Sequence, residues 1–274
     1  MNISVIICTY NAPRELDFAL CGVGRQSVAP LEVLVADDGS DERTRELVKE
    51  WDAACSFSVR HCWQVDRGYR KVRIVNEAVR RARGDFILFL DGDSFPHPRW
   101  IADYREVANE RRIVTGRRVK LGPSYSETVT KEQIAAGKFD RVPGDLWASA
   151  LRRDSLRLGL GLRLPRLVAR ICHPTARRIL GVNYGLPRAA FMDANGYDES
   201  WKEYGNEDRD IGRRLKLLGY PFYPLLNRGI VYHIYHTERV RTAESLALKA
   251  RQAASLEKRC ALGVNNGPPF DEQT

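Results

Sequence analysis

The feature of this sequence that most constrains its fold is a regular alternation of two kinds of segment over the first hundred residues. Apolar, β-rich segments at 3–10, 31–38, 57–64 and 86–91 are separated by segments with a helical pattern at 13–26, 41–52 and 70–82. Nearly continuous apolar strands that alternate with helices are typical of a parallel sheet covered on both faces. The sequence therefore predicts an α/β fold with a mostly parallel sheet flanked by helices.

The middle of the chain carries an unusual concentration of positive charge. Residues 151–180 contain eight arginines against Asp154 alone, interleaved with leucine, valine and isoleucine. This pattern fits two interpretations, a solvated pair of amphipathic helices or an interfacial surface that meets anionic lipid.

The pattern becomes regular again from residue 181. A short strand, a helix and a turn are expected within 181–200, and a second helix within 206–219 begins at Asn206 and ends at Gly219. The run "GIVYHIYH" is β-rich, residues 239–258 form a charged terminal helix, and "GVNNGPPFDEQT" is expected to be a loose tail.

Polar residues follow the predicted strands. In open α/β sheets, ligands bind at the carboxyl ends of the strands, and these ends carry Thr9, Tyr10, Asn11, Asp37, Asp38, Asp91, Gly92 and Asp93. Strand residues two apart point the same way, so Asp91 and Asp93 are expected to converge on one ligand. Their hard oxygens suit Mg²⁺ or Mn²⁺, although Asp-Gly-Asp is also ordinary turn chemistry.

Three segments together resemble a known family. "SVIICTYN", "VADDGSDERT" and "GDFILFLDGDS", in that order and spacing, resemble the inverting family 2 glycosyltransferases of the GT-A fold, which is Rossmann-like. The later run "GVNYGLPRAAFMDANGYDESWKEYGNEDRDIGRRLKLLG" is similar to the C-terminal element of galactosyltransferases and chondroitin-polymerase-type enzymes. The resemblance covers most of 1–236 in two blocks, with 117–180 outside it.

The resemblance implies a single GT-A domain in which successive parts of the chain have different functions. Residues 1–110 would bind the nucleotide sugar, and residues 111–238 would bind the acceptor and hold the catalytic groups. Within the second half, 117–180 would be a basic helical insertion. Residues 239–274 would form a C-terminal helix and a loose tail.

The resemblance also implies roles for the strand-end residues. Tyr10 would lie against the nucleotide base, and Asp38, with Asp37 as the alternate, would accept a hydrogen bond from the uracil N–H. Asp91 would lie near the ribose or a metal-bound water, while Asp93 would bind the metal. Thr9, Asn11, Gly92 and Lys71 complete the expected nucleotide site. Arg70, Lys71, Arg73 and Asn76 would hold diphosphate or support the loop that carries Asp93.

The catalytic acids are expected in "YGNEDRD". An inverting transfer needs a carboxylate that removes a proton from the attacking hydroxyl. By resemblance this base is Asp208, with Glu207 contacting the acceptor or sharing the role; acids in a first turn also stabilise a helix without any function. Trp201 and Tyr204 would offer an apolar platform to a sugar ring, although a core position suits Trp201 almost as well.

A late histidine completes the metal site in many members of this family, and His233 and His236 are the candidates. Positions three apart face opposite sides of a strand, so both can bind one ion only if the chain turns between them. A single histidine ligand is therefore expected, and the sequence leaves open which one.

The net charge and the cysteines indicate which binding partners and which cell compartment to expect. The net charge of +9 favours anionic partners, but there is no Walker loop, zinc finger or aromatic RNA-binding signature, so nucleic acid is not expected. The chain has no apolar run of membrane-spanning length and no export signal, and its cysteines are scattered. The expected location is cytoplasmic, with peripheral binding to the inner face of the cell membrane through 151–180.

The sequence thus favours a metal-dependent inverting glycosyltransferase. It would move a sugar from a nucleotide donor, first of all a UDP-sugar, to a hydroxyl of a glycan or lipid-linked acceptor, in bacterial surface polysaccharide synthesis. The absence of Q-x-x-R-W favours single addition over processive synthesis. The alternatives are a catalytically silent, basic membrane- or polymer-binding protein and a sugar nucleotidyltransferase.

Overall fold

The structure is a computed structural model that describes every residue except 177, 204, 238–241 and 268–274. Its centre is a seven-stranded sheet in which β1, β2, β3 and β4 run parallel, while β8 is antiparallel to both of its neighbours. In spatial order the strands are β3 (Ser58–Trp63), β2 (Glu32–Asp37), β1 (Ile3–Thr9), β4 (Phe86–Asp91), β8 (Asn183–Pro187), β6 (Ile113–Thr115) and β9 (Phe222–Pro224). The predicted α/β fold with a mostly parallel sheet is confirmed.

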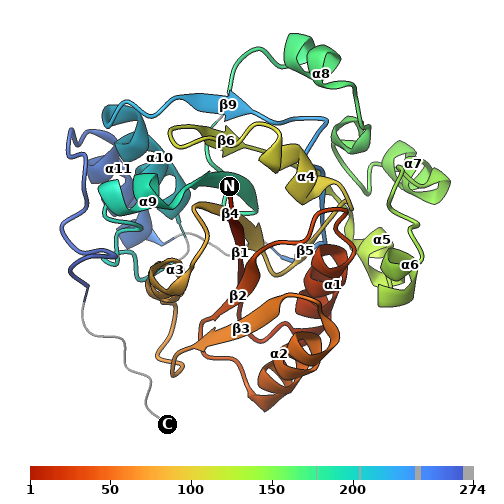
Figure 1. Ribbon diagram of the computed structural model, residues 1–274, viewed down its shortest axis with the longest axis horizontal. Helices are drawn as coiled ribbons and strands as arrows, with labels where there is room; N and C mark the ends of the chain where they lie inside the picture. The colour runs from red at the N-terminus through yellow and green to blue at the C-terminus, as the bar shows by residue number, and fades with distance from the viewer. Residues whose placement is uncertain (177, 204, 238–241, 268–274) are drawn as a thin grey trace.

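Helices cover both faces of this sheet because its strands are apolar on both sides (Figure 1). One face packs against α1 (Pro13–Gly24), α2 (Glu42–Ala54) and α4 (Trp100–Arg105), and the other against α3 (Lys71–Arg81), α9 (Arg188–Asp193) and α10 (Glu207–Leu217). In β4, Leu88 contributes to the first core and Phe89 to the second. This is the period of two that a strand imposes.

A smaller three-stranded sheet lies beside the large one. Its order is β5 (Ser94–Pro96), β10 (Val231–His233) and β7 (Arg118–Lys120). It packs on its own apolar core, which includes Phe95, Tyr232 and Phe139. This sheet brings the segment just after β4 next to the segment that ends at His233, and it thereby builds one wall of the candidate site.

The basic insertion contains several short helices joined by irregular segments, and it lies to one side of the two sheets (Figure 1). It contains α5 (Pro123–Thr128), α6 (Lys131–Ala135), α7 (Gly144–Leu151), a 3₁₀ turn at Leu158–Gly161 and α8 (Arg166–Cys172). The expected helical insertion, 117–180, differs at its start, where residues 118–120 form β7 and join the small sheet. Three residues are too few to show a strand period in the sequence.

The C-terminal part also differs from the expectation. Helix α11 (Ala243–Ala253) is shorter than the predicted 239–258, of which 239–241 lie outside the described residues. The beginning of the expected loose tail is packed: Val264 is 2% exposed, and the Asn195 side chain donates to Asn266 Oδ1 at 2.9 Å and accepts from the Asn265 N–H at 2.9 Å. Tail residues 268–274 are outside the described part.

Among the described residues, no helix combines the length and the apolar character needed to cross a bilayer.

Candidate active site

A cavity of about 570 Å³ opens where the carboxyl ends of β1 and β4 meet the small sheet. The residues that line it come from widely separated parts of the chain. They include Thr9, Tyr10, Asp38, Tyr69, Lys71, Asp91, Gly92, Asp93, Arg118, His233, Tyr235 and His236. The sheet topology therefore gathers most of the residues that the sequence singled out.

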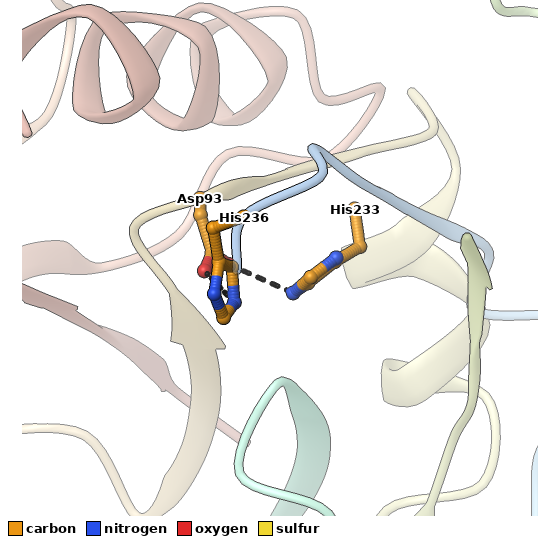
Figure 2. Close-up of side chains that lie close together, drawn as sticks. All are labelled: Asp93, His233 and His236. Atoms are coloured by element: carbon orange, nitrogen blue, oxygen red, sulfur yellow. Dashed lines mark ion pairs between the residues drawn. The ribbon is translucent and has the colours of Figure 1, made fainter. Parts of the chain in front are cut away.

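Asp93 and two histidines form a compact cluster in this cavity (Figure 2). His233 Nε2 lies 3.4 Å from Asp93 Oδ1, and His236 Nε2 lies 3.2 Å from Asp93 Oδ2. Both rings reach the carboxylate because β10 ends at His233 and the chain turns before His236. The geometry thus differs from the expected single histidine.

The cluster fits a divalent metal ion. One ligand atom from each of the three residues can be chosen so that all lie within 4.8 Å of one another. Two ligands on one edge of an octahedral ion with bonds near 2.1 Å are about 3 Å apart, close to the observed separations. Two imidazole nitrogens beside one carboxylate suit a transition metal better than Mg²⁺, so Mn²⁺ fits this donor set better.

The protonation of Asp93 and His233 also suits a cation, whereas the hydrogen bond with Asp93 raises the pKa of His236. Burial acts to raise the pKa of Asp93, but the hydrogen bond from His236 and the nearby His233 outweigh it and lower the pKa to about 2. Burial lowers the pKa of His233 to about 4. At neutral pH, Asp93 is therefore ionised, and His233 is neutral with a lone pair that can bind a metal ion.

Asp91 does not join this cluster, contrary to the expectation that it converges with Asp93. Strand β4 ends at Asp91, and the following turn directs Asp93 elsewhere. Asp91 Oδ1 instead accepts from Lys71 Nζ at 3.0 Å. Burial acts to lower the pKa of Lys71, but Asp91 together with other nearby groups, among them Glu207, outweighs burial, and the pKa lies well above its usual value. Lys71 is therefore a fixed positive charge in the cavity.

Gly92 allows the loop between these two aspartates to lie close against β1. Its N–H donates to Cys8 O at 2.7 Å, and a Cβ at this position would lie 2.7 Å from the same oxygen. Next to it, Thr9 Oγ1 is buried in the cavity wall and has no hydrogen-bond partner among the described residues.

The opposite end of the cavity holds Tyr10 and Asp38. Tyr10 is 41% exposed, and its hydroxyl donates to Asp66 Oδ2 at 2.8 Å, which fixes the ring at the rim. Asp38 accepts from the Arg70 N–H at 2.8 Å and from Gln64 Nε2 at 2.6 Å. Burial raises the pKa of Asp38 to about 6.

Asp37 and Asn11 do not line the cavity. Asp37 is buried, where it accepts from the Ser40 N–H at 2.8 Å and pairs with His61 Nε2 at 2.9 Å. The Asn11 N–H donates to Ser40 Oγ, which joins the loops that follow β1 and β2. These contacts shape the loops and favour Asp38 over its alternate.

Glu207 and Asp208 begin α10, beside the Lys71 end of the cavity. Asp208 accepts from the Gly181 N–H at 2.7 Å and from the Tyr197 hydroxyl at 2.9 Å. Glu207 accepts from the Tyr69 hydroxyl at 3.3 Å, and its other oxygen has no partner among the described residues. Burial, followed by the charge of Asp208, raises the pKa of Glu207 to about 7, and burial also raises the pKa of Asp208.

Three other expectations have different outcomes. The Trp201 side chain is 2% exposed and belongs to the core under α3, so it offers no platform to a sugar. Tyr204 lies outside the described residues. Asn76 is buried, and its side chain bonds the backbone of Tyr197 rather than facing the cavity.

Sequence reasoning missed Arg118 and Tyr69. Arg118 lines the cavity from β7, and its buried Nε has no partner among the described residues. The alternation of charged and apolar residues in "RVKL" was the available signal for this strand, but it is very short. Tyr69 comes from the loop before α3 and has no pattern that marks it.

Family comparisons support the two blocks of the sequence, but they also cover most of residues 117–180, which were expected to lie outside the resemblance. Residues 4–160 match the model "Glycosyl transferase family 2", and residues 171–237 match "N-terminal domain of galactosyltransferase". The chain is 25% identical to chondroitin synthase of Escherichia coli over 250 residues, which are 84% of this chain and 34% of that protein. It is 28% identical to validoxylamine A glucosyltransferase of Streptomyces hygroscopicus subsp. limoneus over 80% of this chain and 49% of that protein. It thus spans about a third to a half of these relatives.

Solved structures share the fold. S. aureus TarS superposes with a TM-score of 0.58 at 17% identity, covering 86% of this chain and 37% of that one. The mannosyltransferase PcManGT from Pyrobaculum calidifontis, in complex with GDP-Man and Mn²⁺, superposes with a TM-score of 0.57 at 16% identity, covering 92% and 61%. At these identities the likeness concerns the fold.

Proposed function

The chain belongs to glycosyl transferase family 2, and on that premise we propose that it is a metal-dependent inverting glycosyltransferase with a nucleotide-sugar donor. The observation that carries the proposal is the cluster of Asp93, His233 and His236 at the carboxyl end of the parallel sheet. In this place a divalent cation, Mn²⁺ or Mg²⁺, would be held by protein ligands on one side and open to a diphosphate on the other.

The donor diphosphate would lie between this cluster and the two cavity cations. Arg118 offers a buried Nε without a partner among the described residues, and Lys71 offers an ammonium group held by Asp91. When the bond between the sugar and the diphosphate breaks, negative charge develops on the leaving oxygen. Fixed positive groups stabilise that charge without reorganisation. A bound cation would stabilise the same negative charge as a Lewis acid.

The nucleoside would occupy the end with Tyr10 and Asp38. The exposed Tyr10 ring offers a flat face for a base, and a partly buried carboxylate such as Asp38 is a strong acceptor for an N–H. A uracil base presents such an N–H, so we assign a UDP-sugar as the first candidate donor. One of the TarS structures that share this fold was obtained in complex with UDP.

Asp208 would act as the base, with Glu207 beside the acceptor. The acceptor oxygen forms a bond to the anomeric carbon, the bond to the diphosphate breaks on the opposite side, and Asp208 takes the hydroxyl proton. Raised pKa values of both carboxyls suit this task, because a base works best when its pKa lies near the working pH. The Tyr197 hydroxyl and the Gly181 N–H fix the Asp208 carboxylate.

The acceptor is proposed to be a hydroxyl of a glycan or a lipid-linked glycan, in the synthesis of a surface polysaccharide. Relatives of this chain include proteins named chondroitin synthase and hyaluronan synthase. No nucleic-acid partner is proposed. The division into a donor half (1–110), an acceptor half (111–238) and a C-terminal segment (239–274) follows the same assignment.

We also propose that the insertion binds an anionic membrane surface from the cytoplasmic side. Leu151, Leu167 and Ile171 are 86%, 73% and 70% exposed, and the exposed Arg152, Arg153, Arg166 and Arg170 accompany them. Exposed apolar groups beside arginines are typical of an interfacial surface. Arg163 is an exception, because it pairs with Asp103. Co-sedimentation with vesicles that contain anionic phosphatidylglycerol tests this proposal, and equal binding to neutral phosphatidylcholine vesicles would contradict it.

The test of the main proposal is binding and turnover of nucleotide sugars. We expect UDP to bind in calorimetry only with Mn²⁺ present, and we expect a UDP-sugar to be hydrolysed or transferred, with loss of activity on chelation. Release of pyrophosphate from UTP and a sugar 1-phosphate would instead indicate a nucleotidyltransferase. Absence of any nucleotide binding would leave the catalytically silent binding protein.

A further inference from the structure

A second cavity of about 530 Å³ lies against α10, and Asp208 is among the residues that line it. Its remaining walls are formed by the loop before β8 and by the start of β9. Three apolar side chains, Ile179, Leu217 and Phe222, contribute to its lining. Asp208 lines this cavity and not the donor cavity, but the two lie close together: burial raises the pKa of Asp208, and the charge of Lys71 in the donor cavity acts against that rise.

The polar lining of this cavity is strongly basic. Asp208, Gly212 and Lys216 recur at intervals of four along α10, so they lie in one row on its surface. Arg209 and Arg213 form the adjacent row, and Arg178 faces them from the loop. Among the described residues that line the cavity, four are cations and Asp208 is the one carboxylate.

Part of this basic lining already has a structural role, and part is available to a ligand. Arg213 donates to Asp210 Oδ1 and to the backbone oxygens of Ser255 and Glu257, which tie α10 to the segment after α11. Lys216 instead lies over the Phe222 ring, with its Nζ 5.3 Å from the ring centroid. Both Arg178 and Lys216 are exposed.

Gly212 has no side chain, so it leaves a depression in the middle of this row of α10. A Cβ there would meet only Ile179, at 3.6 Å or more, so the helix row has a gap between Asp208 and Lys216. Phe222, which is half-buried, offers an apolar face beside the cations. An apolar face next to a polar edge is what a sugar ring presents to a protein surface.

We propose that this cavity is the acceptor subsite and that it selects a saccharide carrying an anionic group, a carboxylate or a phosphate ester. The proposal rests on the proposed function, because it places the acceptor hydroxyl at Asp208. Like charges gathered around one cavity repel one another, and a bound anion relieves that repulsion. Arg178 and Lys216 would contact the anionic group, while Phe222 and Ile179 would contact the ring.

The test compares matched saccharides on the full chain with UDP and Mn²⁺ present. The probes are a disaccharide ending in a hexuronic acid, its neutral hexose counterpart and a hexose 6-phosphate, titrated by calorimetry. Two exposed charge contacts predict a preference for the acidic probes of about five- to tenfold. The relative affinity of the uronate and the phosphate ester identifies which anion the subsite takes.

Variants assign that preference to the cavity. We expect Arg178→Gln with Lys216→Gln to abolish it while leaving affinity for the neutral disaccharide unchanged. The control Lys49→Gln, on the exposed side of α2, should retain it. Equal binding of acidic and neutral probes, persistence of the preference in the double variant, or no binding of either acidic probe would overturn the proposal.

A parallel measurement separates this proposal from the proposed function. Hydrolysis of the UDP-sugar without an acceptor needs the donor cavity alone, so it should be the same in the double variant and in the unchanged chain. If the unchanged chain does not hydrolyse the UDP-sugar, the result counts against the proposed function. A missing preference with intact hydrolysis counts against the acceptor subsite.

Discussion

The cluster of Asp93, His233 and His236 depends on three side chains, each of which can be removed separately. We expect Asp93→Ala, His233→Ala and His236→Ala each to weaken Mn²⁺ binding at least about tenfold, since even groups that only support a metal ligand often cost that much. Titration calorimetry with Mn²⁺ measures the effect. The control is His173→Ala, which removes a histidine that bonds Asn227 and lies outside the cluster. Unchanged Mn²⁺ affinity in His233→Ala would show that the cation binds elsewhere.

Asp208 and Glu207 differ in what each substitution should change. Asp208→Asn should lower kcat by roughly 10²- to 10⁴-fold, the range for a lost general base, while the Kd of UDP stays the same. Glu207→Gln should have a smaller effect on kcat. Steady-state kinetics with a UDP-sugar measure both. Asp52→Asn is a matched control because Asp52 Oδ1 only accepts the Val59 N–H, which an amide oxygen can also do. If Glu207→Gln lowered kcat more than Asp208→Asn does, Glu207 would be the base and Asp208 would contact the acceptor.

Glu207 also links protonation to stability. Burial raises its pKa from 4.5 to about 7, so the folded state holds a proton that the unfolded state releases at lower pH. This contribution to stability is complete below pH 4.5 and is lost as the pH rises through about 7. The variant Glu207→Gln has no titrating group at this position, so it does not lose this contribution to stability as the pH rises. The difference in unfolding free energy between the variant and the unchanged chain should therefore grow by on the order of 1–3 kcal/mol from pH 5 to pH 8.

Urea unfolding at a series of pH values measures this difference. The raised pKa of Asp38 acts in the same direction but is present in both proteins, so it cancels. A difference that stays constant with pH would mean that Glu207 has an ordinary pKa in the folded state.

Among the elements, helix α1 and strand β5 approach each other closely at a glycine. A Cβ on Gly22 would lie 2.6 Å from Pro96 Cδ and 3.0 Å from Pro96 N. Gly22→Ala should therefore destabilise the fold by about 1–3 kcal/mol through overpacking, although alanine is the better helix former. Chemical denaturation measures the change. Gly144→Ala at the start of α7, where a Cβ would meet nothing within 4 Å, should be nearly neutral. Equal stability of the two variants would show that β5 can move away from α1.

The first four strands and three helices follow from local pattern, and each observed boundary lies within two residues of the predicted one. Their apolar periods and their turn residues act over a few positions, which a sequence displays directly. The antiparallel place of β8 between β4 and β6 has no such local signal, because it depends on pairings with strands far away in the chain. The three-residue strand β7 was missed for lack of length.

The site shows the same division. Asp93 could be singled out because it follows a β-rich run, and the resemblance to family 2 pointed to His233 and His236. Their meeting depends on where β4 and β10 end, and the assumption that the strand continues past Asp91 gave the wrong direction for Asp93. The partner of Asp91, Lys71, lies on a helix, and sequence spacing does not place the two together.

At the scale of the whole molecule, Asn195 fastens the C-terminal segment to the rest of the fold. Its backbone has a φ of 61°, and its side chain donates to Cys260 O and Asn266 Oδ1 at 2.9 Å each. Asn195→Ala should lower the unfolding free energy by about 1–3 kcal/mol and speed trypsin cleavage after Lys258 and Arg259. Asn195→Gly keeps the left-handed backbone without strain and should lose only the side-chain contribution. If neither variant changed the cleavage rate, the segment would be held by its other contacts, such as the bonds from Arg213 to the backbone of Ser255 and Glu257.

The place of β8 in the sheet also decides when the molecule can finish folding during its synthesis. The strands β1 to β4 are complete once residue 91 has emerged, but the free edge of β4 must wait for residues 183–187. At usual rates of translation this wait lasts roughly 5–20 s, during which an apolar strand edge is open to pairing with other nascent chains. The helices of the basic insertion are made in this interval. The pairing of β4 with β8 is thus a late step of folding, and the chain order of these two strands alone sets that delay.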